Sequence, residues 1–431
     1  MNFWNAPVAT APVTATVAVP GSKSVTNRAL VLAAIADGPS RIAKPLRARD
    51  TALMAQALGQ LGVGVEEVAT EHGIDWVITP QPLHGPASID CGLAGTVMRF
   101  LPAIASIATG DIRFDGDPRA RVRPMKTIIE ALKSLGVAVD DDGRGTLPFT
   151  LHGTGSVRGG EVELDASASS QFVSALLLAG ARFDNGVTII HRGNSLPSIP
   201  HIDMSVEMLR ERGVEVDVDI ASEHEARWTV HPSAIRALDM TVEPDLSNAL
   251  PFLAAAMVTE GSVTIPDWPQ STTQPGAQVP DLLRQMGAHV ELSADGLTVH
   301  GPTNLLGLNA DLKDVGELTP VLAAICALAT TPSELTGIEH LRGHETDRLT
   351  ALAAEINKAG GDVTELKDGL IINPAPLHES IFESYEDHRM ATAGAVIGLK
   401  VAGIQVENIA TTAKTLPDFD AMWHTMLQGK H

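Results

Sequence analysis

Six stretches of the chain share one arrangement of polar and apolar positions. Each opens with a polar cluster, continues as an Ala- and Leu-rich run of helical length, and ends at a glycine or a Pro/Thr break. Their starts lie roughly 70 to 80 residues apart, a longer period than that of ordinary solenoid repeats. These starts are Ser22, Asp90, Asp165, Asp245, Asp314 and Asp387. The pattern predicts six copies of one larger structural repeat.

A second helix follows in each repeat, and in most repeats it ends in a glycine that leads into a strand-like alternation. ALMAQALGQLGVGVEEV and VPDLLRQMGAHVEL are two cases, and glycine after the last turn is a common helix C-cap. The sixth case, FDAMWHTMLQ, has no strand-like segment after it, whereas the N-terminal PVTATVAVP is strand-like. We therefore expect this N-terminal strand to complete the sixth repeat.

The repeats predict two domains and an α/β fold. Each repeat has the order β-α-β-α-β-β, and three repeats would form each domain. The first domain would span residues 21–239, and the second would combine 1–20 with 240–431, so that the chain crosses near Pro20 and Asp239. Aromatic residues make up only 3% of a chain that is 44% hydrophobic, so the helices are expected to pack closely inside layers of sheet.

Charge and cysteine content narrow the class of protein. A net charge of −21 argues against binding to nucleic acid or to an anionic membrane. No apolar stretch reaches the length of a spanning helix, and the N-terminus lacks the pattern of a secretory signal. Cys91 and Cys326 have no metal-ligand spacing, and no His/Cys/Asp cluster has one either. We expect a cytoplasmic monomer that needs neither metal nor cofactor.

The polar clusters carry the candidate chemistry. Backbone N–H groups at a helix start favour anions, and several clusters add cations or hydroxyls, notably Lys23, Ser24 and Arg28 in the first. DGDPRARVRPM adds Arg119, Arg121 and Arg123, of which the first two could equally form a solvated turn. GSKS lacks the preceding glycine of a phosphate-binding P-loop, so a nucleotide kinase is a poor alternative.

Two acidic residues lie at helix starts among cations. Glu317, in DVGELTP, could simply complement a helix dipole or could act as an acid–base group. Glu345, in HETDRL, could be part of a surface cap, although a cap explains His344 and Arg348 beside it less well.

Together these motifs resemble the EPSP synthase family of enolpyruvyl transferases over the whole chain. PGSKSVTNRALVLAA is similar to the family's opening signature and LAGTVMRF to its second, and SASSQF, HETDRL, DHRMA and TAKTLPDF follow in the family's order. The resemblance implies a two-domain inside-out α/β barrel built from six βαβαββ repeats. It implies transfer of the enolpyruvyl group of phosphoenolpyruvate to the 5-hydroxyl of shikimate 3-phosphate, a step of chorismate and aromatic amino-acid biosynthesis.

The resemblance also implies a role for individual residues. Glu317 would be the general base, with Glu345 and Lys23 as candidates for later proton transfers. The shikimate 3-phosphate site would comprise Lys23, Ser24, Arg28, Ser169, Ser170, Gln171, Ser198, Glu317 and His344. The phosphoenolpyruvate site would comprise Lys23, Gly95, Thr96, Arg123, Gln171, Arg348, Arg389 and Lys414. The family's inhibitor glyphosate competes with phosphoenolpyruvate, and Gly95 leaves room beside that site.

Four positions depart from the family's pattern. Leu93, Phe100, His201 and His344 stand where Asn, Pro, Tyr and Lys are frequent, and His344 turns a fixed charge into a titratable one. Two other functions remain open. One is UDP-N-acetylglucosamine enolpyruvyl transferase, whose usual loop cysteine is absent from DGDPRARVRPM. The other is an inactive binding protein on the same fold, against which the intact set of charged residues argues.

Overall fold

The computed structural model describes residues 2–71 and 73–429. The chain forms two compact parts, which we call the first lobe (Gly21–Val242) and the second lobe (the chain up to Pro20 together with Glu243 onward). The short strand β14 (Met240–Thr241) pairs in parallel with β3 (Ser40–Ala43), so the segment just after residue 239 stays with the first lobe. No helix in the described part of the chain is both long and apolar enough to cross a membrane.

The described strands form six small sheets, three in each lobe. In the first lobe the sheets have the orders β14–β3–β5 (Gly73–Thr79)–β4 (Gly64–Thr70), β6 (Ala87–Asp90)–β7 (Thr109–Asp115)–β9 (Phe149–Thr154)–β8 (Ala138–Asp140) and β10 (Gly160–Leu164)–β11 (Val187–Arg192)–β13 (Glu225–Val230)–β12 (Val216–Ile220). In the second lobe the orders are β16 (His289–Ser293)–β17 (Gly296–His300)–β15 (Ser262–Ile265)–β2 (Thr14–Thr16), β18 (Asn309–Asp311)–β19 (Ser333–Thr336)–β21 (Leu370–Asn373)–β20 (Asp362–Glu365) and β1 (Phe3–Asn5)–β23 (Gln405–Glu407)–β22 (Ile381–Phe382). The mixed α/β fold class is therefore as the sequence predicts.

The prediction that the N-terminal strand PVTATVAVP completes the sixth repeat is wrong. The strand-like alternation is real, because Val13, Ala15 and Val17 are buried while the threonines between them are exposed. However, β2 pairs in parallel with β15, which places it in the sheet of the fourth repeat. It fills the edge that β14 leaves by pairing with β3. The sixth repeat is completed instead by β1, which pairs antiparallel with β23.

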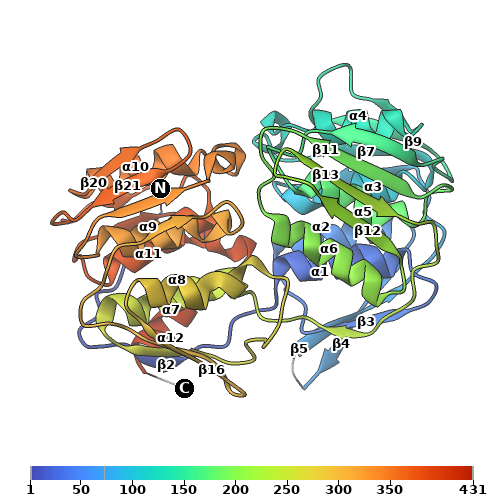
Figure 1. Cartoon of the computed structure of the whole chain (residues 1–431). Helices are drawn as coiled ribbons and strands as arrows, with labels where there is room; N and C mark the ends of the chain where they lie inside the picture. The colour runs from blue at the N-terminus through green and yellow to red at the C-terminus, as the bar shows by residue number, and fades with distance from the viewer. Residues whose placement is uncertain (1, 72, 430–431) are drawn as a thin grey trace. The chain divides into compact units, whose positions relative to one another are not determined.

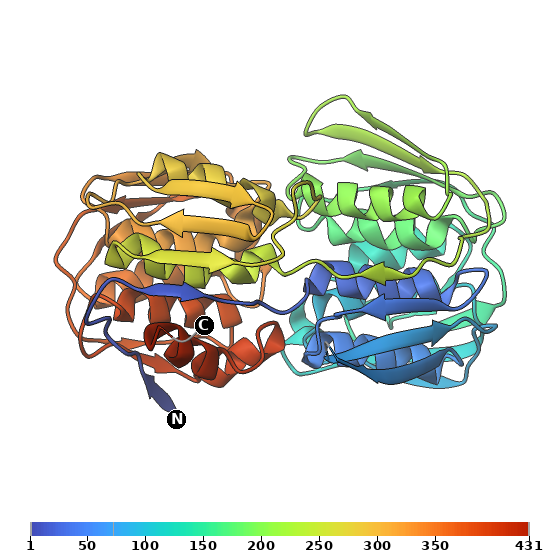
Figure 2. The same ribbon diagram turned by 90° about the horizontal axis from the view of Figure 1, so that it is seen from below.

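The first helix of each repeat lies inside its lobe. These helices are α1 (Lys23–Ala34), α3 (Gly95–Ala105), α5 (Gln171–Gly180), α7 (Leu246–Thr259), α9 (Thr319–Ala327) and α11 (His388–Gly398). Nearly every residue in them is buried, and within a lobe they pack on one another, as α3 does on α5 and α9 on α11. Alanine-rich sequences suit this position because small side chains let helices approach closely. Figures 1 and 2 show these inner helices with sheets packed against them in each lobe.

The second helices have one buried face and one more accessible face. They are α2 (Arg49–Gln60), α4 (Lys126–Ser134), α6 (Ile199–Glu211), α8 (Val279–Gln285), α10 (Arg348–Lys358) and α12 (Phe419–Leu427). This architecture matters for function because it brings the polar clusters to the beginnings of the buried first helices, where backbone N–H groups have no partner within the helix.

Candidate active site

Side chains from the polar clusters cap several helices. The hydroxyl of Ser22 accepts a hydrogen bond from Val25 N at the start of α1. Asp387 accepts one from Arg389 N at the start of α11, and Asp347 accepts one from Thr350 N at the start of α10. The clusters are thus helix starts in the structure, as the sequence predicts, and part of each cluster serves the helix itself.

In the first lobe, Lys23 and Ser24 occupy the first turn of α1, and the Lys23 Nζ lies 3.8 Å from Asp50 Oδ2 on α2. Arg28, one turn further along α1, is buried and donates hydrogen bonds to neighbouring helices. It is 1% exposed and donates to Ser205 Oγ at 2.8 Å, Ser24 O at 3.1 Å, Ser174 Oγ at 3.2 Å and His201 O at 2.7 Å.

Arg28, which the sequence resemblance assigns to the shikimate 3-phosphate site, also has an aromatic neighbour. Its guanidinium also lies over the ring of Phe100, 5.1 Å from the centroid, and burial lowers its pKa to about 9. In this conformation it ties α1 to α5 and α6. Phe100, one of the departures from the family's pattern, therefore has a structural partner here.

Gly95 brings several polar side chains of the first lobe together. A Cβ atom at this position would lie 2.8 Å from Arg99 Nη1, 3.1 Å from Gln171 Oε1 and 3.5 Å from Arg123 Nη2. Arg99 donates to Gln171 Oε1 at 3.0 Å, and Arg123 Nη1 donates to the Leu93 carbonyl at 3.3 Å. Gly95, Arg123 and Gln171, which were all assigned to phosphoenolpyruvate from the sequence, are thus neighbours. A side chain larger than glycine would crowd Arg99 and Gln171, while Arg123 lies at an ordinary van der Waals distance.

The hydroxyl-bearing candidates of the first lobe lie at helix starts. Thr96, in the first turn of α3, accepts a hydrogen bond from Asn27 Nδ2 at 2.8 Å. Ser169 Oγ accepts one from Gln171 N at 3.3 Å, with Ser170 at the N-cap of α5. Ser198 precedes α6 with φ of 58°, a left-handed conformation that is uncommon for a residue other than glycine.

Arg121 was predicted either to contact a substrate anion or to lie in a solvated turn, and its contacts fit the solvated turn. It is largely exposed and forms a bidentate pair with Asp115, at 2.8 and 3.0 Å. The hydrogen bond from Arg121 lowers the pKa of Asp115. It is therefore part of a solvated surface turn.

The second lobe gathers the remaining candidates around Arg348. This residue is 1% exposed and donates from Nε to Asp387 Oδ2 at 2.8 Å and from Nη2 to Asp387 Oδ1 at 3.2 Å. Its Nη2 also donates to Glu345 Oε2 at 3.2 Å, and Nη1 lies 3.2 Å from His344 Nδ1. Burial disfavours the charge of Arg348, but Asp387 and Glu345 outweigh this effect and the pKa of the guanidinium is raised.

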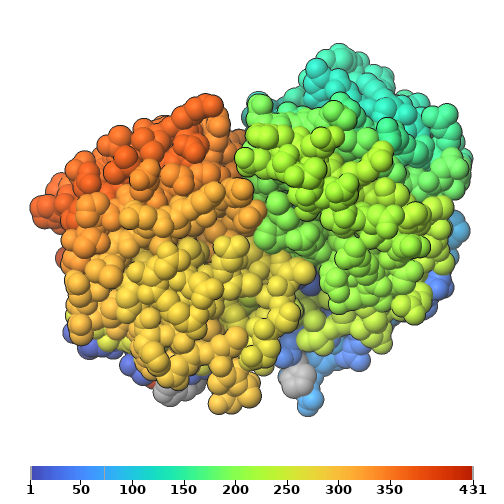
Figure 3. Space-filling view, viewed as in Figure 1, coloured from blue at the N-terminus to red at the C-terminus, as the bar shows by residue number. Residues whose placement is uncertain are grey.

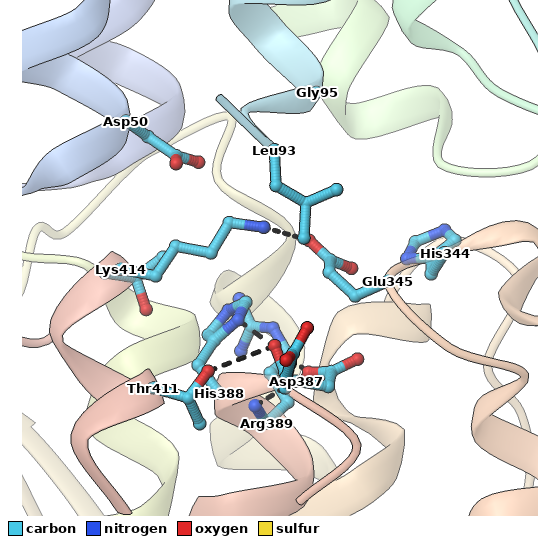
Figure 4. Close-up of polar contacts among 12 residues, drawn as sticks. Asp50, Leu93, Gly95, His344, Glu345, Asp387, His388, Arg389, Thr411 and Lys414 are labelled. Carbon is cyan, nitrogen blue, oxygen red and sulfur yellow. Dashed lines mark hydrogen bonds and ion pairs between the residues drawn. The ribbon is translucent and has the colours of Figure 1, made fainter. Parts of the chain in front are cut away.

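Both candidate acid–base carboxylates are paired with cations. Glu317 accepts a hydrogen bond from Arg389 Nη2. Glu345 accepts from Lys414 Nζ as well as from Arg348, and Figure 4 shows the lysine reaching toward this carboxylate. In the second lobe Lys414, Glu345, Arg348 and Asp387 therefore form a network of alternating charges, and the pair of Arg389 with Glu317 joins it through the hydrogen bond from Arg389 N to Asp387. Such a network holds each carboxylate in a defined orientation.

His344 belongs to this network, but its charge differs from the sequence expectation. Burial, and then the neighbouring Arg348, hold the pKa of His344 well below its usual range. The ring of His340 lies 5.8 Å away, and burial lowers the pKa of that residue to about 4. We expected His344 to change charge in the usual histidine range. The structure instead makes it a neutral ring at neutral pH.

Sequence reasoning did not assign a role to Asp387, which proves central. It is fully buried, caps α11 and pairs with Arg348 through both of its carboxylate oxygens. The available signal was the Asp-His-Arg order at a helix start, but an N-cap role alone accounts for aspartate at that position. Its partner Arg348 lies 39 positions earlier in the chain, so no local sequence pattern shows this pairing.

Comparisons with known proteins show the family of the chain. The family model described as EPSP synthase (3-phosphoshikimate 1-carboxyvinyltransferase) matches residues 8–423. The curated 3-phosphoshikimate 1-carboxyvinyltransferase of Kocuria rhizophila is 54% identical over 430 residues, which cover 98% of this chain and 96% of that protein.

Two solved structures are similar over nearly the whole chain. EPSP synthase from Acinetobacter baumannii has a TM-score of 0.78 and 25% identity, with 98% of each chain covered. The enolpyruvyl transferase NikO from Streptomyces tendae has a TM-score of 0.74 at 19% identity, covering 97% of this chain and 96% of that one, and so supports the fold alone. The fold is that of enolpyruvyl transferases. Within that class, the chain belongs to the EPSP synthase (3-phosphoshikimate 1-carboxyvinyltransferase) family.

Proposed function

We propose that this protein is an enzyme that transfers the enolpyruvyl group of phosphoenolpyruvate to the 5-hydroxyl of shikimate 3-phosphate, releasing phosphate. The observation that carries the proposal is the network in the second lobe, where two carboxylates are held among Arg348, Arg389 and Lys414, in a chain 54% identical to a 3-phosphoshikimate 1-carboxyvinyltransferase. The reaction needs such a combination, because it moves protons between groups that carry two phosphates and a carboxylate.

Cations would neutralise the substrates. The groups that we assign to phosphoenolpyruvate are Arg123, the Gly95–Thr96 turn, Arg348, Arg389 and Lys414. Arginine suits this task because its planar fork donates two hydrogen bonds to one carboxylate or phosphate.

A second set of residues would bind shikimate 3-phosphate. It comprises Lys23, Ser24, Arg28, Ser169, Ser170, Gln171, Ser198, Glu317 and His344. Lys23 and Gln171 would contact both substrates. Four internal hydrogen bonds hold Arg28 beside Ser24 at the start of α1.

The chemistry would proceed by addition and elimination. The 5-hydroxyl oxygen attacks C2 of phosphoenolpyruvate and gives its proton to Glu317, while C3 gains a proton. The tetrahedral adduct then loses phosphate by cleavage of the C2–O bond, and C3 loses a proton to restore the double bond. Glu345, bonded to Lys414, and Lys23 are the groups that we assign to C3 and to the departing phosphate.

An assay for inorganic phosphate tests the proposal. The purified protein should release phosphate from phosphoenolpyruvate when shikimate 3-phosphate is present. It should release none with UDP-N-acetylglucosamine, the acceptor of the alternative enolpyruvyl transferase. Phosphate release with the sugar nucleotide alone would replace our proposal by that alternative, and release with neither acceptor would favour an inactive binding protein.

We also propose that the enzyme acts as a cytoplasmic monomer without a metal cofactor and without binding nucleic acid or membranes. Both cysteines are free and buried, which fits a reducing compartment, and the acidic net charge fits a protein that binds neither nucleic acid nor anionic membranes. Light scattering on the purified protein would test the monomeric state.

A further inference from the structure

Five of the repeats contain a β-hairpin in which three solvent-facing positions recur. In repeats two to four the first position lies two residues after the glycine that ends the second helix, at Gly136, Gly213 and Gly287. The second position is two residues further along the same strand. The third lies on the next strand, directly across from the first, as the pairing of His289 with His300 shows. Residues at i and i+2 on a strand share one face, so all three side chains can meet.

The residues at these positions change from repeat to repeat. In repeats one to five, the trios are Gly64/Glu66/Thr79, Ala138/Asp140/His152, Glu215/Asp217/His231, His289/Glu291/His300 and Asp362/Thr364/Asn373. Among the hairpins that the structure describes, the fourth repeat is the one that places two imidazoles beside a carboxylate.

The fourth-repeat trio has the geometry of a metal site. One ligand atom each from His289, Glu291 and His300 lies within 4.8 Å of the others. His289 Nδ1 is 3.4 Å from Glu291 Oε1, and the rings of His289 and His300 have centroids 5.6 Å apart. The hairpin β16–β17 lies at the surface of its lobe, in the yellow region of Figures 1 and 3. His289 and Glu291 are exposed and His300 is half-buried, so the side chains can adjust.

We propose that His289, Glu291 and His300 form a binding site for a divalent transition-metal ion, with water completing the coordination shell. Two imidazoles and one carboxylate are ligands that Zn²⁺, Ni²⁺ and Cu²⁺ accept. A tetrahedral ion with bonds of about 2.0–2.1 Å places its ligand atoms about 3.4 Å apart, a spacing that small rotations of these side chains provide. The site should bind Zn²⁺ and Ni²⁺ more weakly than it binds Cu²⁺.

This site is separate from the proposed catalytic network, since none of its residues contributes to that network. A hairpin joined by a metal across its two strands is stabilised whenever the ion binds the folded chain more tightly than the unfolded one. The inference therefore does not rest on the proposed enzymatic function.

The equivalent trio in the third repeat supplies an internal comparison. There Glu215 stands at the position of His289, so the trio has one imidazole, and His231 Nε2 lies 2.8 Å from Asp217 Oδ2. If position and ligand type decide metal binding, Glu215→His should create a second site.

The test is calorimetric titration of the full-length, chelator-treated protein with NiCl₂ and with ZnCl₂. We expect one ion per chain for the wild type, affinity weakened more than about tenfold in His289→Glu and in His300→Gln, and two ions per chain in Glu215→His. His152→Asn removes an exposed histidine beside Asp111 and should leave the titration unchanged. Circular dichroism confirms that each variant is folded.

Two results would overturn the proposal. The first is a wild type that takes up neither ion. The second is binding of equal affinity and stoichiometry in the wild type, His289→Glu and His300→Gln, which would place the ion at other histidines. Phosphate release by each variant in the presence of both substrates should match the wild type, and this readout is independent of the metal result.

Discussion

Replacing Glu317 by glutamine removes the proposed general base while leaving its surroundings nearly unchanged. The two side chains have the same length, and the amide oxygen of glutamine can still accept the hydrogen bond from Arg389. Arg389 therefore keeps an acceptor, and its proposed contact with phosphoenolpyruvate should survive. What the variant loses is the capacity to take a proton from the 5-hydroxyl.

The expected loss is in turnover. General acid–base catalysis contributes about 10²- to 10⁴-fold, so the barrier should rise by about 3–5 kcal/mol. Stability should change little, because Glu317 is about one quarter exposed and a pair of this kind contributes about 1 kcal/mol. We therefore expect kcat to fall at least about 100-fold with the KM for each substrate nearly constant.

Steady-state kinetics with both substrates varied, together with thermal unfolding, would measure these effects. Glu339→Gln is a matched control, because Glu339 is an exposed carboxylate paired with Lys367 at 3.5 Å on the same lobe. A Glu317→Gln enzyme with turnover near that of the wild type would remove this residue from the chemistry. A large rise in KM with unchanged kcat would make it a binding residue only.

Three further outcomes follow from particular contacts. Arg28→Lys cannot satisfy all four acceptors of Arg28 and should lower the free energy of unfolding in urea by about 2–4 kcal/mol. An unchanged unfolding midpoint would show that these hydrogen bonds are replaceable. Burial lowers the pKa of His340 from 6.5 to about 4, so the folded chain binds fewer protons than the unfolded chain between these values, and the free energy of unfolding should fall as the pH drops from 6.5 toward 4. His340→Asn should lose less stability over this range, and equal pH profiles of the two proteins would contradict the argument. Prolonged chelation should leave phosphate release intact, even though it strips the site at His289; a loss of activity restored by one divalent ion would contradict metal-free catalysis.

The fold was largely predictable from the sequence because its signals are local and repeated. The Ala-rich runs after polar clusters became the buried helices, and glycines such as Gly213 and Gly287 adopt the positive φ that ends a helix. The sequence did not predict that β14 pairs with β3 or that β2 takes the open edge beside β15. Alternation along Val13 to Val17 identifies a strand, but it does not say which of several similar sheets has an open edge.

The sequence proposed the candidate site as a set of residues, but it did not show the contacts among them. Charged residues at helix starts were evident, and Gly95, Arg123 and Gln171 are indeed neighbours. The internal partners of Arg28 and the pair between Arg348 and Asp387 depend on tertiary packing, so no short pattern contains them. The same limit hid the His289 site, whose register across a hairpin is a structural fact rather than a motif.

The most direct test of the central claim follows the fate of the oxygen that joins C2 to phosphorus in phosphoenolpyruvate. Our account requires cleavage of the C2–O bond, so substrate labelled with ¹⁸O at that bridging position should deliver the label to the released phosphate when shikimate 3-phosphate is the acceptor. Phosphorus NMR resolves labelled from unlabelled phosphate by the isotope shift. Phosphate that carries the label, together with an enol ether product, is the predicted result. Unlabelled phosphate, with pyruvate as the other product, would mean cleavage of the P–O bond and would contradict enolpyruvyl transfer.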